Sequence, residues 1–300
     1  MNKFVIRQLE RVNTLLDRWM ERRAKEIHFP GNVELLEDIP YLEDGRPCHR
    51  MDLYRPRDTA GPLPVIVNLH GGGMLLCTKV VNRPFCAELA KRGFLVFCLE
   101  YPLVPESDIP GILRDVARGM DTVDGMLEQF GGDRNRVYLV GDSAGAFISV
   151  YEAAARNNPL LAAAIPLTSS QLPVNALGLI SGMYYTTLTD SVGFFLRKDF
   201  YGEDWKTNPM QPYFDPACEG VAGCLPPCFL VTSKSDNLHG YTAKFYKGLQ
   251  KAGTPCTLVD FPLLKKLQHD FVIVKPEHPD AQRAIDRMVD FLLQHENSRN

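Results

Sequence analysis

The 300-residue sequence contains no long apolar run and no export signal. No window approaches the ~18 apolar residues that a transmembrane helix needs. The first 29 residues carry charges scattered along their length, whereas a signal peptide places its positive charges ahead of one apolar block. We therefore expect no membrane span and a cytoplasmic location, where the eight cysteines remain reduced thiols.

An excess of basic charge is missing as well. The formal net charge is −3, so the chain lacks the positive footprint that proteins use to bind nucleic acid or an anionic membrane. No internal repeat is visible, which argues against a solenoid. Because 45% of the residues are hydrophobic, the chain can still bury a sizeable core. These features predict no nucleic-acid partner and leave a homodimer open.

The sequence also lacks the common metal and phosphate motifs. Cys218, Cys224 and Cys228 lie close together, but their spacing matches no common zinc pattern and no histidine lies among them. Neither G-x-x-x-x-G-K-[ST] nor G-x-G-x-x-G, the usual phosphate-binding motifs, is found. We expect no metal site and no cofactor.

What the sequence does contain, from about residue 49 onward, is an alternation of short apolar runs and helical segments. Five continuous apolar runs are typical of strands buried on both faces: PVIVNLH, FLVFCLEY, RVYLVGD, ALGLIS and CFLVTSKSD. The stretch HRMDLYRP alternates like a half-buried strand. Helical stretches are predicted at 82–92, 109–130, 144–156, 241–251 and 280–294. This order predicts an α/β fold with a mostly parallel central sheet and helices on both faces.

Two segments do not follow this alternation. The first 27 residues carry an apolar stripe at helical spacing: Val5, Leu9, Val12, Leu16 and Trp19. Residues 183–217 are aromatic-rich and longer than an ordinary strand-to-helix connection. We predict a single domain over residues 1–300, with a helical cap formed at about 1–45 and 183–217. An elaborated helix on one sheet face remains the alternative for the second segment.

Aromatic side chains of that second segment have two interpretations. Either they line the substrate pocket or they only pack the cap, and the sequence does not separate the two. The residues concerned are Tyr184, Tyr185, Phe194, Phe195 and Tyr201.

The stretch YLVGDSAGAF contains a G-x-S-x-G motif immediately after a predicted strand and at the start of a predicted helix. In this context the motif is a nucleophile elbow, whose sharp turn exposes a serine at the carboxyl end of the sheet. Ser143 is therefore the predicted nucleophile. Gly141 and Gly145 leave room for the turn, and Asp142 and Ala144 complete the motif.

Three glycines follow His70 in the stretch VNLHGGGMLLC. An H-G-G-G sequence after a strand is the oxyanion loop of lipases and esterases, whose backbone N–H groups bind the negative charge that develops on the carbonyl oxygen. Gly71 and Gly72, with Ala144 after the nucleophile, are the predicted donors, and Gly73 supports the loop. We expect His70 to shape the loop, and Gly72→Ala to depress kcat far more than it alters the fold.

Together these motifs resemble those of the α/β-hydrolase superfamily, specifically the hormone-sensitive-lipase-like (bacterial family IV) esterases with the GDSAG elbow. A second stretch, EYPLVPESDIPGILRDV, is similar to the family's Y-R-L-A-P-E motif, and LPPCFLVTSKSDNL follows its L-P-P…D-x-L segment. Residues in matching places are Tyr101, Leu103, Pro105, Glu106, Pro110 and Asp115. The resemblance spans residues 49–291 and departs from the family at Pro102, Val104 and 236–240.

A serine nucleophile needs a base, and the base needs an orienting acid. In α/β hydrolases the order along the chain is serine, acid, histidine. Asp236 follows an apolar run and matches the family's acid position, and His269 matches the family's H-x-F. The predicted triad is therefore Ser143, Asp236 and His269. We expect the adjacent Asp270 to point elsewhere, and we regard these as weaker competitors: His239, His278, His295 and Asp260.

The resemblance implies a serine carboxylesterase that acts on short- to medium-chain esters through an acyl-enzyme, with a small-molecule ester as its partner and no cofactor. An amidase such as an arylformamidase would use the same triad. A non-catalytic ligand receptor of this fold is a third interpretation, but such receptors have lost the histidine that this chain retains.

Overall fold

The computed structural model describes residues 30–57, 59, 61–167 and 171–296, together with positions 7, 11, 12, 14, 15, 18 and 22. Within these residues one eight-stranded sheet has the order β1-β2-β4-β3-β5-β6-β7-β8. The first three strands in that order pair antiparallel, and every other pair is parallel. The predicted mostly parallel sheet is therefore confirmed.

The strands are β1 (Val33–Pro40), β2 (Arg50–Pro56), β3 (Leu63–Leu69), β4 (Leu95–Leu99), β5 (Gly132–Asp142), β6 (Ala176–Ile180), β7 (Cys228–Ser233) and β8 (Cys256–Phe261). The five from β3 to β7 form where the continuous apolar runs predict them. Every residue of β4, β6 and β7 is buried. Continuous apolar runs result because helices cover both faces of these strands.

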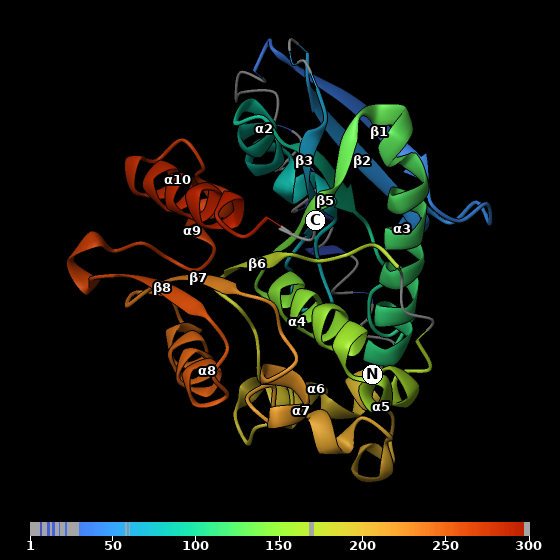
Figure 1. Ribbon diagram of the computed structural model, residues 1–300. Helices are drawn as coiled ribbons and strands as arrows, with labels where there is room; N and C mark the ends of the chain where they lie inside the picture. The colour runs from blue at the N-terminus through green and yellow to red at the C-terminus, as the bar shows by residue number, and fades with distance from the viewer. Residues whose placement is uncertain are drawn as a thin grey trace.

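Helices pack on both faces of the sheet, as predicted (Figure 1). Helices α2 (Arg83–Lys91) and α10 (Pro279–Leu293) share one core with one face, and α3 (Ile109–Phe130), α4 (Ala144–Asn157) and α8 (His239–Lys251) share a second core with the other. The short elements are α5 (Pro159–Ala164), α7 (Glu219–Ala222), α9 (Phe271–Val274), η1 (Pro47–His49), η2 (Lys79–Asn82) and η5 (Leu263–Lys265).

The ends of α3 show how local sequence sets a helix boundary. Asp108 accepts a hydrogen bond from the N–H of Gly111 at the helix start, and Pro110 occupies the first turn. Gly131 ends the helix in the left-handed conformation with φ 75°. These signals explain why the predicted range 109–130 and the observed one are the same.

The first two strands depart from the sequence-based expectations. Residues 33–40 were expected in the cap, but they form β1 at the edge of the sheet. β2 was expected to be half-buried, but it lies between β1 and β4 and is almost entirely buried. The buried carboxylate of Asp52 forms ion pairs with Lys79 at 2.8 Å and Arg83 at 3.2 Å. A charged residue in this strand is therefore compatible with burial and does not indicate a face exposed to solvent.

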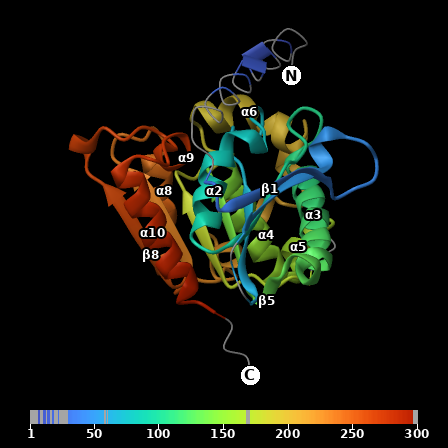
Figure 2. The ribbon, with the colours of Figure 1, turned by 90° about the horizontal axis from the view of Figure 1, so that it is seen from above.

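The segment 183–217 lies between β6 and α7 and contains α6 (Ser191–Tyr201), η3 (Trp205–Thr207) and η4 (Gln211–Tyr213). Figure 2 shows α6 at the same end of the sheet as α9. Of the predicted N-terminal stripe, only Val12 is described, and it is 43% exposed; its other members lie outside the described residues. No helix in the described part of the chain is long and apolar enough to cross a membrane.

Candidate active site

The predicted nucleophile lies on a strained turn between β5 and α4. Ser143 has φ 48° and ψ −111°, a conformation that non-glycine residues rarely adopt. A Cβ added at Gly141 would lie 2.4 Å from the backbone of Gly145, and one at Gly145 would lie 1.9 Å from the carbonyl oxygen of Leu69. The N–H of Ser143 donates to Ile180 O at 2.8 Å. Close backbone packing on both sides therefore holds the turn.

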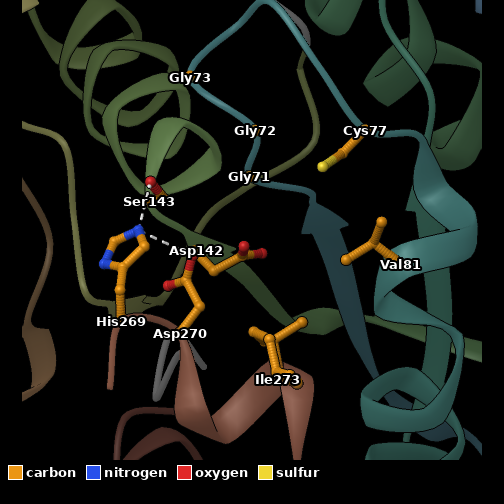
Figure 3. A pocket seen from close by; sticks show the side chains of 11 residues that line it. Gly71, Gly72, Gly73, Cys77, Val81, Asp142, Ser143, His269, Asp270 and Ile273 are labelled. Atoms are coloured by element: carbon orange, nitrogen blue, oxygen red, sulfur yellow. Dashed lines mark hydrogen bonds and ion pairs between the residues drawn. The ribbon is translucent and has the colours of Figure 1, made fainter. Parts of the chain in front are cut away.

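The three predicted triad residues come together at the carboxyl ends of the strands, and Figure 3 shows Ser143 and His269 facing each other. His269 Nε2 lies 3.0 Å from Ser143 Oγ, and His269 Nδ1 lies 2.8 Å from Asp236 Oδ1. The same Asp236 oxygen accepts the N–H of Leu238 at 2.7 Å. Because the Asp236 side chain is fully buried and that of His269 is 30% exposed, the acid is fixed while the imidazole faces a cavity.

Contact between Asp236 and His269 shifts the pKa of each residue toward its charged form. Burial alone would raise the pKa of Asp236, but the hydrogen bond and charge of His269 hold it below its usual range. Burial alone would lower the pKa of His269, but its hydrogen bonds to Asp236 and Asp270 raise it to about 10. The folded protein thus favours a proton on the histidine.

Asp270 does not point elsewhere as predicted. Its Oδ2 lies 3.0 Å from His269 Nε2, the same nitrogen that faces Ser143 (Figure 3). The cause is the backbone of Asp270, whose φ of 53° lies in the left-handed region. The sequence gives no sign of this conformation because aspartate occupies both the right- and left-handed regions. Asp270 is therefore a site residue that the sequence interpretation missed.

Gly71, Gly72 and Gly73 form a loop directly after β3, beside the nucleophile (Figure 3). Among the described residues, none accepts a hydrogen bond from the N–H of Gly71 or Gly72. α4 begins at Ala144, whose N–H is among the unpaired donors of a helix start. These three N–H groups remain the predicted oxyanion donors.

Two glycines of this loop have sterically demanding positions. A Cβ at Gly71 would lie 2.3 Å from Asp142 Oδ2, and one at Gly72, where φ is 110°, would lie 1.9 Å from the carbonyl oxygen of Leu76. Gly72→Ala must therefore shift the loop, and the expectation that it depresses kcat far more than it alters the fold stays a prediction. Gly73, by contrast, has no atom within 4 Å of an added Cβ.

His70 lies behind the loop with no exposed surface. Its Nε2 faces Glu100 Oε1 at 2.9 Å, and its Nδ1 faces the carbonyl oxygen of Gly71 at 2.7 Å. Since both partners are acceptors, both ring nitrogens donate. Burial opposes the resulting charge, but Glu100 and Gly71 leave the pKa of His70 above its ordinary value. Its ring also stacks on Tyr101, with centroids 4.3 Å apart.

The partners of His70 connect it to neighbouring elements. Tyr101 donates its hydroxyl to the carbonyl oxygen of His70 at 2.6 Å, and Glu100 Oε2 accepts the N–H of Lys79 at 2.8 Å. Glu100 is a residue that the sequence interpretation did not single out. Register could have found it, because Leu69 pairs with Leu99 and the next residues are then His70 and Glu100.

The other candidates lie elsewhere. Glu106 is largely exposed and forms an ion pair with Arg46. Each weaker histidine has its own partner: His239 pairs with Asp260 at 3.1 Å, His278 Nδ1 accepts the N–H of Asp280 at 3.1 Å, and His295 Nδ1 donates to Phe291 O at 2.8 Å. These contacts agree with the preference for His269 over all three.

A cavity of about 320 Å³ opens beside Ser143 and His269. Its apolar wall comes from Cys77, Val81, Ile273 and Val274, and Figure 3 shows Val81 and Ile273 across the cavity from the serine. Asp142 and Asp270 also line it. Burial and the nearby charge of Asp270 raise the pKa of Asp142 to about 7, although Asn82 donates to its Oδ1 at 2.7 Å.

None of the four candidate aromatic residues of the segment 183–217 whose side chains are described lines this cavity: Tyr184, Tyr185, Phe194 and Tyr201. Tyr184 is buried and stacks on Phe245, and Tyr201 is buried and shares a 2.7 Å hydrogen bond with Thr186. Tyr185 packs edge-on against Tyr241, Phe194 is 60% exposed, and the side chain of Phe195 lies outside the described part. These contacts favour packing over pocket lining.

The fold and this arrangement define a class of protein. The profile of the α/β hydrolase fold family matches residues 66–273, more than half of the sequence. The chain belongs to the α/β hydrolase fold family, and the resemblance found in its motifs is confirmed.

Three similar proteins make the relationship more particular. The chain is 30% identical over 257 residues to a probable isoprenylcysteine α-carbonyl methylesterase of Oryza sativa subsp. japonica, covering 81% of this chain and 60% of that protein. It is 28% identical over 226 residues to an acetyl-hydrolase of Streptomyces hygroscopicus, covering 74% and 72%. The structure of esterase B from Lactobacillus rhamnosis matches its fold with a TM-score of 0.88, at 19% identity, over 96% of this chain and 93% of that one.

The plant relatives are longer than their matched parts. The chain spans 60% of the length of the rice protein and 47% of that of an isoprenylcysteine α-carbonyl methylesterase of Arabidopsis thaliana.

Proposed function

We propose that this chain is a serine carboxylesterase that hydrolyses short- to medium-chain carboxylic esters through an acyl-enzyme intermediate. The observation that carries the proposal is the continuous row of contacts from Asp236 through His269 to Ser143, beside an apolar cavity. A serine hydroxyl is a weak nucleophile at neutral pH, and such a row supplies both the base and the acid that orients it.

In the proposed reaction, His269 Nε2 takes the proton of Ser143 as Oγ attacks the ester carbonyl. Asp236 accepts the hydrogen bond of Nδ1–H and stabilises the imidazolium. The N–H groups of Gly71, Gly72 and Ala144 donate to the oxygen that becomes negative. His269 then gives the proton to the leaving alcohol, and water releases the acyl group by the same route.

The size and chemistry of the cavity support small substrates. A cavity of about 320 Å³ is at the lower end of the usual range for ligand pockets, and its apolar wall suits an alkyl group. A methylesterase and an acetyl-hydrolase are among the similar proteins, which supports a small group on either side of the ester bond.

The proposal also covers the domain organisation, location and oligomeric state of the protein. Residues 1–300 would act as one domain, with the segment 183–217 as part of a cap. A cytoplasmic location and a homodimer belong to the same proposal, and neither a metal nor a cofactor takes part in the reaction described.

The test is a series of p-nitrophenyl esters from acetate to laurate, measured with the unchanged protein and with Ser143→Ala. We expect turnover that falls as the acyl chain lengthens, and a loss of about 10⁴-fold or more in Ser143→Ala. A preference for a formanilide over the butyrate ester would establish an amidase instead. Absent turnover together with no organophosphate label on Ser143 would favour a receptor.

A further inference from the structure

Asp270 occupies a helix-capping position but does not cap its helix. It is the residue before α9, where an aspartate ordinarily accepts a hydrogen bond from the first turn. Its side chain makes no such bond. The carboxylate is directed instead at His269, with Oδ2 3.0 Å from Nε2.

The remaining contacts of Asp270 keep its carboxylate in the site. The residue is 9% exposed, and its Oδ1 is buried with no hydrogen-bond partner among the described residues. Its N–H donates to Ser181 Oγ at 3.4 Å, and its carbonyl oxygen accepts the N–H of Ile273 at 2.9 Å. The backbone is therefore fixed, and within the described part of the chain the charge of the buried carboxylate is paired through His269.

Asp270 Oδ2 lies 3.0 Å from His269 Nε2, within ion-pair distance of the ring. A carboxylate this close favours the charged form of an imidazole, because opposite charges attract. In the imidazolium the lone pair of Nε2 is occupied by its proton. In this state Nε2 cannot accept the proton of Ser143.

We propose that Asp270 is a positioning residue whose carboxylate, beside His269 Nε2, favours the protonated ring, so that His269 becomes free to act as a base only in more alkaline solution. The proposal rests on the proposed esterase function. When the pair loses its proton to solvent, the Nε2 lone pair becomes free and turns to Ser143 Oγ, which lies 3.0 Å away.

The charged groups around His269 agree with this direction. Asp236 faces Nδ1 from the turn after β7, and Asp270 faces Nε2 from the start of α9. Asp142, at the end of β5, adds a further acidic group near Asp270, and the charge of His70 acts on Asp142 in turn. The hydrogen bonds to Asp236 and Asp270 together raise the pKa of His269 to about 10, against the opposing effect of burial.

Two substitutions test the proposal without disturbing the left-handed backbone. Asp270→Asn keeps the shape and removes the charge, and Asp270→Gly removes the side chain; both residue types tolerate a positive φ. Asp260→Asn is the matched control, because it removes a carboxylate that pairs with His239 and not with His269.

The primary measurement is the titration of the His269 ring by NMR in the full chain, with the signal assigned by its disappearance in His269→Gln. We expect both Asp270 variants to lower its midpoint by about 1–3 pH units, and Asp260→Asn to leave it unchanged. Midpoints that agree between the unchanged protein and both variants would overturn the proposal. No substrate is needed, so this result stands apart from whether the chain is an esterase.

The second measurement is the pH profile of p-nitrophenyl butyrate hydrolysis. We expect the acid limb of kcat/KM to move to lower pH in both Asp270 variants. At any pH below the midpoints, activity should then rise about tenfold for each pH unit by which the limb moves. A profile that keeps its midpoint in both variants would contradict the proposal. Absent hydrolysis at every pH would instead contradict the proposed function, while the NMR midpoints still decide the role of Asp270.

Discussion

Two of the histidines that face carboxylates, His269 and His70, lie in opposite surroundings. His269 contacts Asp236 and Asp270, has a side chain that is 30% exposed, and faces the cavity. His70 contacts Glu100 and has no exposed surface. The pKa of each is raised above its ordinary value in spite of burial. A histidine–carboxylate pair therefore does not by itself identify a base.

The difference lies in what the second ring nitrogen contacts. Nδ1 of His70 donates to a backbone carbonyl oxygen, that of Gly71, which accepts a hydrogen bond but does not exchange a proton. Nε2 of His269 faces a hydroxyl and a carboxylate, both of which exchange protons. The first histidine fixes a backbone position, and the second has the surroundings that proton transfer needs.

The largest expected effect comes from exchanging the base for a neutral residue. His269→Gln should lower kcat/KM by about 10⁴-fold or more and should also lower the melting temperature, because it leaves the buried carboxylates of Asp236 and Asp270 without their charged partner. Hydrolysis of p-nitrophenyl butyrate and thermal unfolding check both parts. If His70→Gln lowered kcat/KM as much as His269→Gln does, without changing the melting temperature, the distinction between a base and a loop-supporting histidine would be wrong.

The next effect concerns the loop that His70 supports. Gly72→Ala should lower kcat by about 10²–10³-fold and also lower the melting temperature, because its Cβ meets the carbonyl oxygen of Leu76. Gly73→Asn is the matched control, since the position is left-handed and open and asparagine tolerates that conformation. Equal losses of kcat in the two variants would show that any side chain in this loop lowers activity, and that the close contact at Gly72 is not the cause.

A smaller effect on activity is expected when His70 loses the charge of its partner. Glu100→Gln should destabilise the protein by about 1.5–3 kcal/mol, the usual contribution of a hydrogen bond to a charged group. Because Glu100 does not reach Ser143, kcat should fall much less than in Gly72→Ala. Chemical denaturation and steady-state kinetics measure the two effects. An unchanged stability would mean that the ion pair contributes nothing net.

The smallest effect is a change in how stability depends on pH. The pKa of His70 is higher in the folded protein than its ordinary value, so its stabilising contribution is complete below about pH 6.5 and is lost as the pH rises through the folded pKa. His70→Gln should therefore flatten the fall in unfolding free energy above about pH 6.5. Denaturation at several pH values measures the slope, and parallel curves for the two proteins would contradict the prediction.

Local chemistry made much of the fold and the candidate site predictable. The apolar runs located the parallel strands, and Asp108 and Gly131 defined α3. The elbow glycines at 141 and 145 are required by contacts of 2.4 Å and 1.9 Å, so a serine between them has little choice of conformation. Chain order then supplied Asp236 and His269, which the structure brings together with Ser143.

The features that the sequence did not predict depend on tertiary contacts. β1 carries three acidic residues and pairs only with β2 at the sheet edge, so it has no periodic apolar pattern. The direction of the Asp270 carboxylate depends on one backbone angle. The pairing of His70 with Glu100 depends on the adjacency of β3 and β4, a long-range property that residue spacing does not contain.

Lys79 joins the edge of the sheet to the glycine loop. Its ammonium contacts Asp38 in β1 and Asp52 in β2, both at 2.8 Å, and its N–H donates to Glu100, the partner of His70. A continuous row of polar contacts thus runs from the outermost strand to Gly71. A tag, insertion or fusion placed at β1 would therefore act on the glycine loop beside Ser143 as well as on the edge of the sheet, and any redesign of this edge has to keep the contacts of Lys79.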